Sequence, residues 1–75
     1  MINYYKFTTS SFKVNTELKT IEHVNNSDTK SMNHITSVNL FDGMIIAITR
    51  DNWETITEEQ FNTAKADILS YLSSL

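Results

Sequence analysis

The C-terminal quarter of the chain carries the clearest structural signal. Thr57 can accept hydrogen bonds from the free amides of a helix start, and Gln60 completes a capping box with it. Ile56 and Phe61 flank this start at the two positions of a hydrophobic staple. Apolar side chains then recur at steps of three and four residues, at Phe61, Ala64, Ile68, Tyr71, Leu72 and Leu75. We therefore predict an amphipathic helix over about residues 57–74, with one face packed on a core.

The chain has 75 residues, which is enough for one domain, residues 1–75, with a small core. A core of this size supplies only about 3 to 5 kcal/mol, so such domains usually gain stability from disulfides, a metal or association. The absence of cysteine excludes disulfides and thiolate metal sites. The apolar content of 40% is typical of a folded protein. Association with a protein partner or a second copy is therefore the expected source of additional stability.

The first half of the chain reads as short strands separated by polar turns. Runs rich in β-branched and aromatic residues predict strands over about residues 2–8, 12–15 and 18–24. The next stretch, residues 25–33, is polar and rich in turn-forming residues. We expect it to be a mobile loop, because few apolar side chains anchor it.

Gly43 is the only glycine of a chain that has no proline. Asp42 and Gly43 lie between two β-rich runs, residues 35–41 and 44–50, and an Asp-Gly pair in this setting is typical of a hairpin turn. We therefore predict a β-hairpin here. Strands followed by a single helix indicate an α+β fold, in which a small antiparallel sheet of four to five strands carries the C-terminal helix across one face.

This architecture leaves the second face of the sheet without cover. One helix covers one face, so the strands should alternate between apolar and polar residues, but residues 44–48 are apolar throughout. Leaving one buriable isoleucine in water forgoes about 1.5 to 3 kcal/mol. We expect the domain to self-associate or to dock on another protein through this face. The predicted partner-binding residues are Tyr4, Ile45, Ala47 and Trp53.

Two readings within the chain compete with that expectation. The loop of residues 25–33 or the side chain of Trp53 could cover Ile45 and Ala47 without any partner. Trp53 lies in the connection that precedes the C-terminal helix, where it can plug the end of the core or serve as an interface hot spot.

The residues offer little for catalysis or cofactors. Metal sites need three or four ligands, and His23 and His34 have no partners at a ligand spacing. There is no cysteine nucleophile and no serine between glycines, and a single glycine cannot form a phosphate-binding loop. We therefore predict no enzyme activity, no metal or other cofactor and no small-molecule substrate. The longest apolar run is far shorter than the roughly 20 residues of a membrane span, and no signal peptide is present, so a cytoplasmic protein is expected.

Single-stranded nucleic acid is the alternative ligand. Lys6 and Lys13 are interleaved with ring-bearing residues on the predicted strands, and such rings can stack on bases while lysines hold phosphates. The aromatic residues concerned are Tyr4, Tyr5, Phe7 and Phe12. The net charge of −3 weakens this reading, and packing of Phe7 and Phe12 in the core is the simpler one.

The composition is rich in asparagine, isoleucine and threonine and poor in glycine and proline, as expected of an AT-rich genome. Short chains of this kind are common among phage and mobile elements. We therefore expect a noncatalytic structural or protein-interaction module of such an element, which acts as a virion component or as an inhibitor that binds a host protein.

Overall fold

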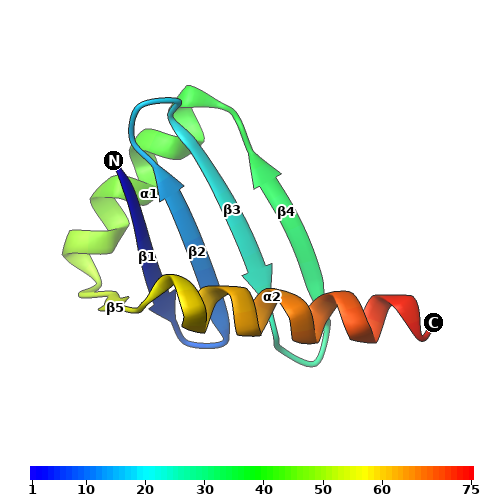
Figure 1. Cartoon of the computed structure of the whole chain (residues 1–75). Helices are drawn as coiled ribbons and strands as arrows, with labels where there is room; N and C mark the ends of the chain where they lie inside the picture. The colour runs from blue at the N-terminus through cyan, green and yellow to red at the C-terminus, as the bar shows by residue number, and fades with distance from the viewer.

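The computed structural model describes residues 1–75 as one sheet between two helices (Figure 1). The elements, in chain order, are β1 (Ile2–Phe7), β2 (Ser10–Asn15), β3 (Thr20–Asn25), β4 (Ser31–Ile35), α1 (Val38–Arg50), β5 (Glu54–Thr55) and α2 (Glu58–Ser73). All strand pairs are antiparallel, and the five strands lie in the order β4-β3-β2-β1-β5. The predicted α+β class, with an antiparallel sheet and a C-terminal helix packed on one face, is confirmed.

The predicted hairpin is wrong, because residues 38–50 form the helix α1. The Ser37 side chain caps this helix by accepting a hydrogen bond from the Leu40 amide at 3.5 Å. Four apolar residues then follow at helical spacing and pack in one cluster: Phe41, Met44, Ile45 and Ile48. Gly43 lies exposed within the helix and does not have a positive φ. The burial of this apolar stripe outweighs both the β-propensity of the isoleucines and the turn preference of Asp42 and Gly43.

The turns of the sheet do not use the glycine at all. Positive φ values occur instead at Thr8 (53°), Lys19 (54°) and Asn52 (53°). The turn after β2 is held by the Asn15 side chain, which accepts hydrogen bonds from the amides of Glu17 and Leu18 at 3.1 and 3.0 Å. Side chains that bond their own backbone therefore replace glycine and proline as turn formers in this chain.

The polar stretch of residues 25–33 is only partly a loop. Its last three residues belong to β4, which begins at Ser31 and forms one edge of the sheet, and its first residue, Asn25, ends β3. The remaining turn is held by the Asn25 side chain, which accepts from the Ser27 amide at 3.1 Å, and by the Lys30 ammonium, which donates to the Ser27 carbonyl at 3.4 Å. The prediction of a loop over the whole stretch is therefore wrong for Asn25 and for residues 31–33, which belong to strands.

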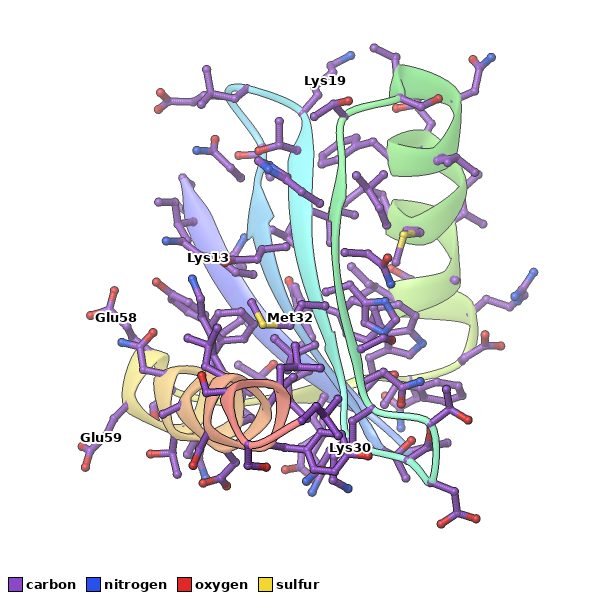
Figure 2. The ribbon with its side chains drawn as sticks, turned by 90° about the vertical axis from the view of Figure 1, so that its right-hand side faces the viewer. Lys13, Lys19, Lys30, Met32, Glu58 and Glu59 are labelled. Carbon is purple, nitrogen blue, oxygen red and sulfur yellow. The ribbon has the colours of Figure 1, made fainter.

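The two helices lie on opposite faces of the sheet (Figure 2). On the α1 face, a core cluster contains Phe12, Val14, Ile21 and Phe41. On the α2 face, a second cluster contains Val24, Ile56, Phe61 and Ile68. Residues paired across adjacent strands share a face, so the pairs Val14 with Ile21 and Ser11 with Val24 place these clusters on opposite sides. The face that was expected to need a partner is covered by α1.

The start of α2 agrees with the sequence. The Thr57 hydroxyl accepts from the Gln60 amide at 3.1 Å, and the Gln60 side chain accepts from the Thr57 amide at 2.8 Å. Both members of the staple, Ile56 and Phe61, are buried in the same cluster. Because Thr57 is the cap, the helix runs over Glu58–Ser73, within one residue of the predicted bounds.

Candidate protein interface

The four predicted partner-binding residues do not form one surface. Tyr4 lies on the α2 face, where it is half-buried against the α2 cluster, with its ring centroid 5.6 Å from that of Phe61. Its hydroxyl donates to the Glu58 carboxylate at 2.7 Å, and this hydrogen bond raises the pKa of the Tyr4 phenol. Ile45, Ala47 and Trp53 belong to α1 or to the segment that follows it. Tyr4 is therefore separated from the other three by the sheet.

Trp53 packs inside the α1 face rather than at a surface. Its ring stacks on Phe12, with centroids 4.4 Å apart, and on Phe7, with centroids 5.4 Å apart. Ile45 packs against the same cluster, and Ala47 is half-buried on α1. These side chains were selected because their face lacked cover, and α1 with Trp53 now provides that cover. These three side chains therefore lack the uncovered face for which they were chosen.

Three of the four rings of the nucleic-acid alternative, Tyr5, Phe7 and Phe12, lie on the face of the sheet opposite its lysines. Tyr4 shares the lysine face, but its ring packs against the α2 cluster and its hydroxyl is bonded to Glu58. Phe12 is buried on the α1 face, whereas Lys13, the next residue of the same strand, projects to the α2 side, as Figure 2 shows. Lys6 alternates with Phe7 in the same way. Because a stacking platform needs rings and cations on one surface, the geometry does not favour single-stranded nucleic acid as the ligand.

A hydroxyl and an imidazole meet at Ser10 and His23, whose Oγ and Nε2 atoms are 2.8 Å apart. The His23 ring also stacks on Phe12, with centroids 4.7 Å apart, and burial lowers the pKa of this histidine. No carboxylate orients the ring, and no hollow of the surface is lined by either residue. The pair therefore ties β2 to β3 and offers no space for a substrate. The structure also contains no cluster of three or more His, Asp or Glu side chains that could hold a metal ion.

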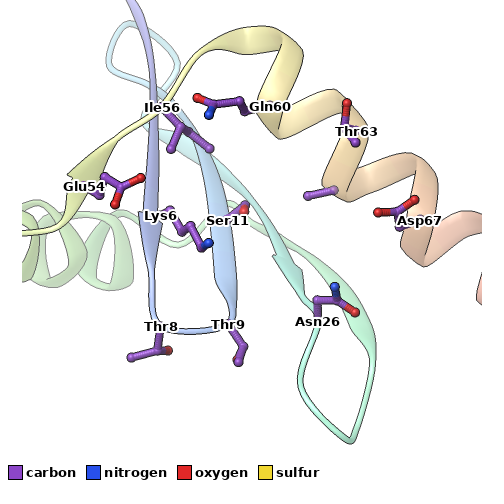
Figure 3. Close-up of a pocket in the computed structure, with 11 residues that line it drawn as sticks. Lys6, Thr8, Thr9, Ser11, Asn26, Glu54, Ile56, Gln60, Thr63 and Asp67 are labelled. Atoms are coloured by element: carbon purple, nitrogen blue, oxygen red, sulfur yellow. The ribbon is translucent and has the colours of Figure 1, made fainter.

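A polar groove of ≈ 400 Å³ lies between α2 and the end of the β1–β2 hairpin (Figure 3). Lys6 and Glu54 line it from the strands, and Asp67 lines it from α2. Ser11, which is 7% exposed, lies in its floor, but no histidine lines the groove beside this hydroxyl. Threonine and amide side chains and two apolar residues complete the wall: Thr8, Thr9, Asn26, Ile56, Gln60, Thr63 and Ala64. The groove can offer hydrogen bonds to a polar group, and it holds no activated nucleophile.

The two edges of the sheet differ in how much backbone they leave open. One edge is β5, which has two residues, and the other is β4, which has five. Figure 2 looks onto the β4 edge, where no further element lies beside the strand. Free amide and carbonyl groups along such an edge can pair with another strand.

α2 extends beyond this same edge, as Figure 1 shows. Its buried residues, Phe61 and Ile68, lie over the sheet, and Ile68 packs in a cluster with Met32 of β4. Leu72 and Leu75 continue the stripe at the next helical positions but are 39% and 82% exposed. Leu69 beside them is 47% exposed. The sheet-facing side of α2 is thus longer than the sheet beneath it. We call β4 together with Leu69, Leu72 and Leu75 the lateral surface.

The α2 face is also incompletely covered, because α2 crosses it nearer one end of the strands. At the other end lies a shallow hollow of ≈ 200 Å³ between the strand side chains. Lys13, labelled in Figure 2, lies there on the α2 side of the sheet and away from the helix. We call the residues that line this hollow the bare region: Ile2, Lys13, Asn15, Thr20, Glu22 and His34.

No sequence signal singled out the lateral surface, since β4 was predicted as a loop. Leu72 and Leu75 were part of the predicted apolar stripe, whereas Leu69 was not, and only the structure shows that all three are exposed. Neither helix is long and apolar enough to cross a membrane. Comparison of the chain with models of protein families, with curated proteins and with solved structures gives no significant match.

Proposed function

We propose that this domain is a noncatalytic protein-interaction module that binds a protein partner through its lateral surface. The observation that supports this most is the end of α2, which extends beyond the β4 edge and leaves Leu72, and Leu75 just after the helix, exposed. An apolar stripe that continues past its own core is expected where another chain completes the core.

The position of these leucines supports a directed contact. Exposed apolar side chains also occur on α1, at Leu40 and Ile46, but single exposed side chains are ordinary on protein surfaces. Leu72 and Leu75, in contrast, belong to the end of the chain, where α2 extends past the open edge of β4. A single partner strand can therefore both pair with β4 and pack against the end of α2. Strand addition of this kind combines main-chain hydrogen bonds with the burial of side chains.

The composition supports a phage or mobile element as the biological setting, with the protein acting in the host cytoplasm or in the virion. A virion component and an inhibitor of a host protein use such a surface differently. The first repeats one contact many times in an assembly, and the second forms a complex of fixed stoichiometry with one protein.

Site-specific photo-crosslinking tests the proposal. A photoreactive amino acid is placed at Leu72 or Asn33, which lie on the lateral surface, and at Ile46 on the outer side of α1 as the matched control. The protein is expressed in the organism that encodes it, irradiated, and its adducts are identified by mass spectrometry. We expect one reproducible protein adduct from the two lateral positions and none from Ile46.

Two results would overturn the proposal: no protein adduct from either lateral position, or the same adducts from Ile46. Adducts that sediment with particles support the virion component, and a single host protein in one-to-one complex supports the inhibitor. A nucleic-acid adduct at the lateral positions without any protein would contradict the proposed partner class.

A further inference from the structure

We infer that the occupant of the lateral surface is a second copy of this chain, which pairs its β4 antiparallel to β4 and joins the two sheets into one. The five strands of each copy then form a single sheet of ten. The free end of each α2 lies over the bare region of the other copy. This inference rests on the proposed function, because it names the partner of the same surface.

The lengths of the elements fit this arrangement. α2 has 16 residues, which corresponds to about 24 Å at 1.5 Å per residue. It begins near β1, where Glu58 bonds Tyr4, and three strand spacings of about 4.8 Å separate β1 from β4. The helix therefore exceeds the distance to β4 by about 10 Å, which is the width of two further strands. β4 and β3 of a second copy would fill this width.

Symmetry brings the free helix end to the region that lacks cover. An antiparallel pair of identical strands is related by a two-fold axis perpendicular to the sheet, so both α2 helices lie on the same face. The axis exchanges the two ends of β4. α2 crosses β4 near its first residues, close to Met32, so α2 of the second copy crosses near the other end of the strand, close to His34. His34 belongs to the bare region.

The charges of the two surfaces are complementary. The last turn of α2 contains no basic residue of its own to compensate the negative end of the helix dipole, and the cation of the chain that lies beside it is Lys30, whose ammonium is 5.4 Å from the centroid of the Tyr71 ring. Lys13 of the bare region takes part in none of the three ion pairs, whereas its neighbour Glu22 is already bonded to Lys65. In the dimer, Lys13 and His34 of one copy face the end of α2 of the other.

β4 carries none of the features that usually protect an exposed edge. It contains no proline and no Lys, Arg, Asp or Glu side chain, and its pairing with β3 runs through all five residues without a bulge. The opposite edge, β5, is only two residues long. The chain thus offers one edge for pairing, which closes the assembly at two copies.

The oligomeric state in solution tests the inference first. Sedimentation equilibrium of the whole chain between about 1 and 500 µM should show a reversible monomer–dimer equilibrium. Leu72→Glu should raise the dimer Kd about ten-fold or more, because a buried leucine contact is replaced by a charge. Ile46→Glu, a substitution of a 63% exposed isoleucine on α1, should leave the Kd unchanged. Circular dichroism of both variants verifies that each remains folded.

Single cysteines then test the geometry, because the chain contains none of its own. Cysteine replaces each residue of β4 in turn under mild oxidation, and Ile46→Cys serves as the control. Near the two-fold axis, each cysteine meets its own copy across the strand pair, so at least one of the variants Met32→Cys, Asn33→Cys and His34→Cys should form a disulfide dimer much faster than Ile46→Cys. This readout does not depend on how stable the Leu72 variant is.

A strict monomer at 500 µM overturns the inference, as does disulfide formation at Ile46 as fast as in β4. These results leave the proposed function intact if photo-crosslinks from Leu72 and Asn33 still reach a different protein. The absence of every lateral crosslink, in contrast, overturns the proposed function itself. The two failures are therefore distinguishable.

Discussion

The two faces of the sheet are closed in different ways. On the α1 face, contacts are aromatic and aliphatic, and stacked rings of Phe7, Trp53, Phe12 and His23 follow one another across three strands and the segment after α1. On the α2 face, a smaller apolar cluster is joined by polar ties, the bond from Tyr4 to Glu58 and the ion pair between Lys65 and Glu22. The difference indicates that α1 and Trp53 cover the α1 face within the chain, whereas α2 is bonded to one end of the α2 face and leaves the other end uncovered.

The largest effect on the free energy of unfolding is expected when a buried ring is removed from each face in turn. Phe61→Ala removes a fully buried ring from the α2 face and should cost about 3 to 5 kcal/mol, comparable with the whole stability of a domain this small. Phe12→Ala should be equally severe on the α1 face. Urea denaturation followed by circular dichroism measures both, and a small effect of either substitution would show that its face is not part of the core.

Milder substitutions sharpen the same point. Phe61→Leu and Phe12→Leu lie in separate clusters, so their effects on the free energy of unfolding should add within about 0.5 kcal/mol. Strong coupling between them would contradict two independent faces.

The ion pair between Lys65 and Glu22 on the α2 face should contribute less to the free energy of unfolding than the buried rings do. Lys65→Met removes the 2.5 Å bond to Glu22 and leaves a carboxylate that is only 25% exposed without its partner. We expect a loss of about 1 kcal/mol at low salt that shrinks in 1 M NaCl. Arg50→Met is the control, because its pair with Asp51 at the end of α1 is more exposed and should contribute less. Equal losses of stability in Lys65→Met and Arg50→Met would show that the Lys65–Glu22 ion pair does not distinguish the α2 face from the α1 face.

Gly43→Ala tests the identity of α1. A Cβ at this position meets nothing within 4 Å, and the glycine φ is not positive, so alanine should stabilise the helix by about 0.5 to 1 kcal/mol. A hairpin turn at Asp42 and Gly43 would respond in the opposite sense, because its positive φ disfavours alanine. A thermal unfolding curve distinguishes the two, and a lowered Tm would contradict the helix.

The smallest effect should come from His23. Burial lowers the pKa of His23 below its ordinary value of 6.5, so the charged imidazole is disfavoured in the folded protein. Stability should be constant above about pH 6.5 and should fall as the pH drops through that value towards the lower folded pKa. His23→Gln should reduce this dependence between pH 7.5 and 5.5, whereas His34→Gln, at an exposed position, should retain it. Identical profiles for the two variants would contradict the assigned burial.

The sequence predicts the parts of this fold whose signals are local and agree. The cap at Thr57, the staple and the apolar stripe all lie within one segment, and α2 follows them closely. The first three strands are likewise found within about two residues of their predicted ends, because residue alternation reports a half-buried strand directly.

The segment around Gly43 shows where local reasoning fails. Its isoleucines favour a strand and its Asp-Gly pair favours a turn, but Phe41, Met44, Ile45 and Ile48 also satisfy the helical period. Tertiary packing on the α1 face decides between these patterns, and β-propensity is a weak guide when burial opposes it. The helical spacing was present in the sequence and is the signal that could have found α1.

The candidate interface was less accessible to sequence reasoning. Ile45 and Ala47 were chosen as residues of a strand but belong to α1, Trp53 packs on the α1 face, and Tyr4 lies on the opposite face, so the choice depended on the wrong hairpin. Leu72 and Leu75 lie in the predicted stripe, but their exposure depends on how many strands α2 crosses and on where the helix starts. That distance is a property of the assembled sheet, which no single segment specifies.

Trp53 gives the chain a built-in optical reporter. It is the only tryptophan, and its indole nitrogen is buried without a hydrogen-bond partner among the rings of the α1 face. Its fluorescence should therefore shift to longer wavelength only when that face opens, whereas far-ultraviolet circular dichroism follows both helices. If the open α2 face unfolds first, the transitions followed by fluorescence and by circular dichroism will have different midpoints in a denaturant titration. Dimer formation at β4 should make the two midpoints coincide.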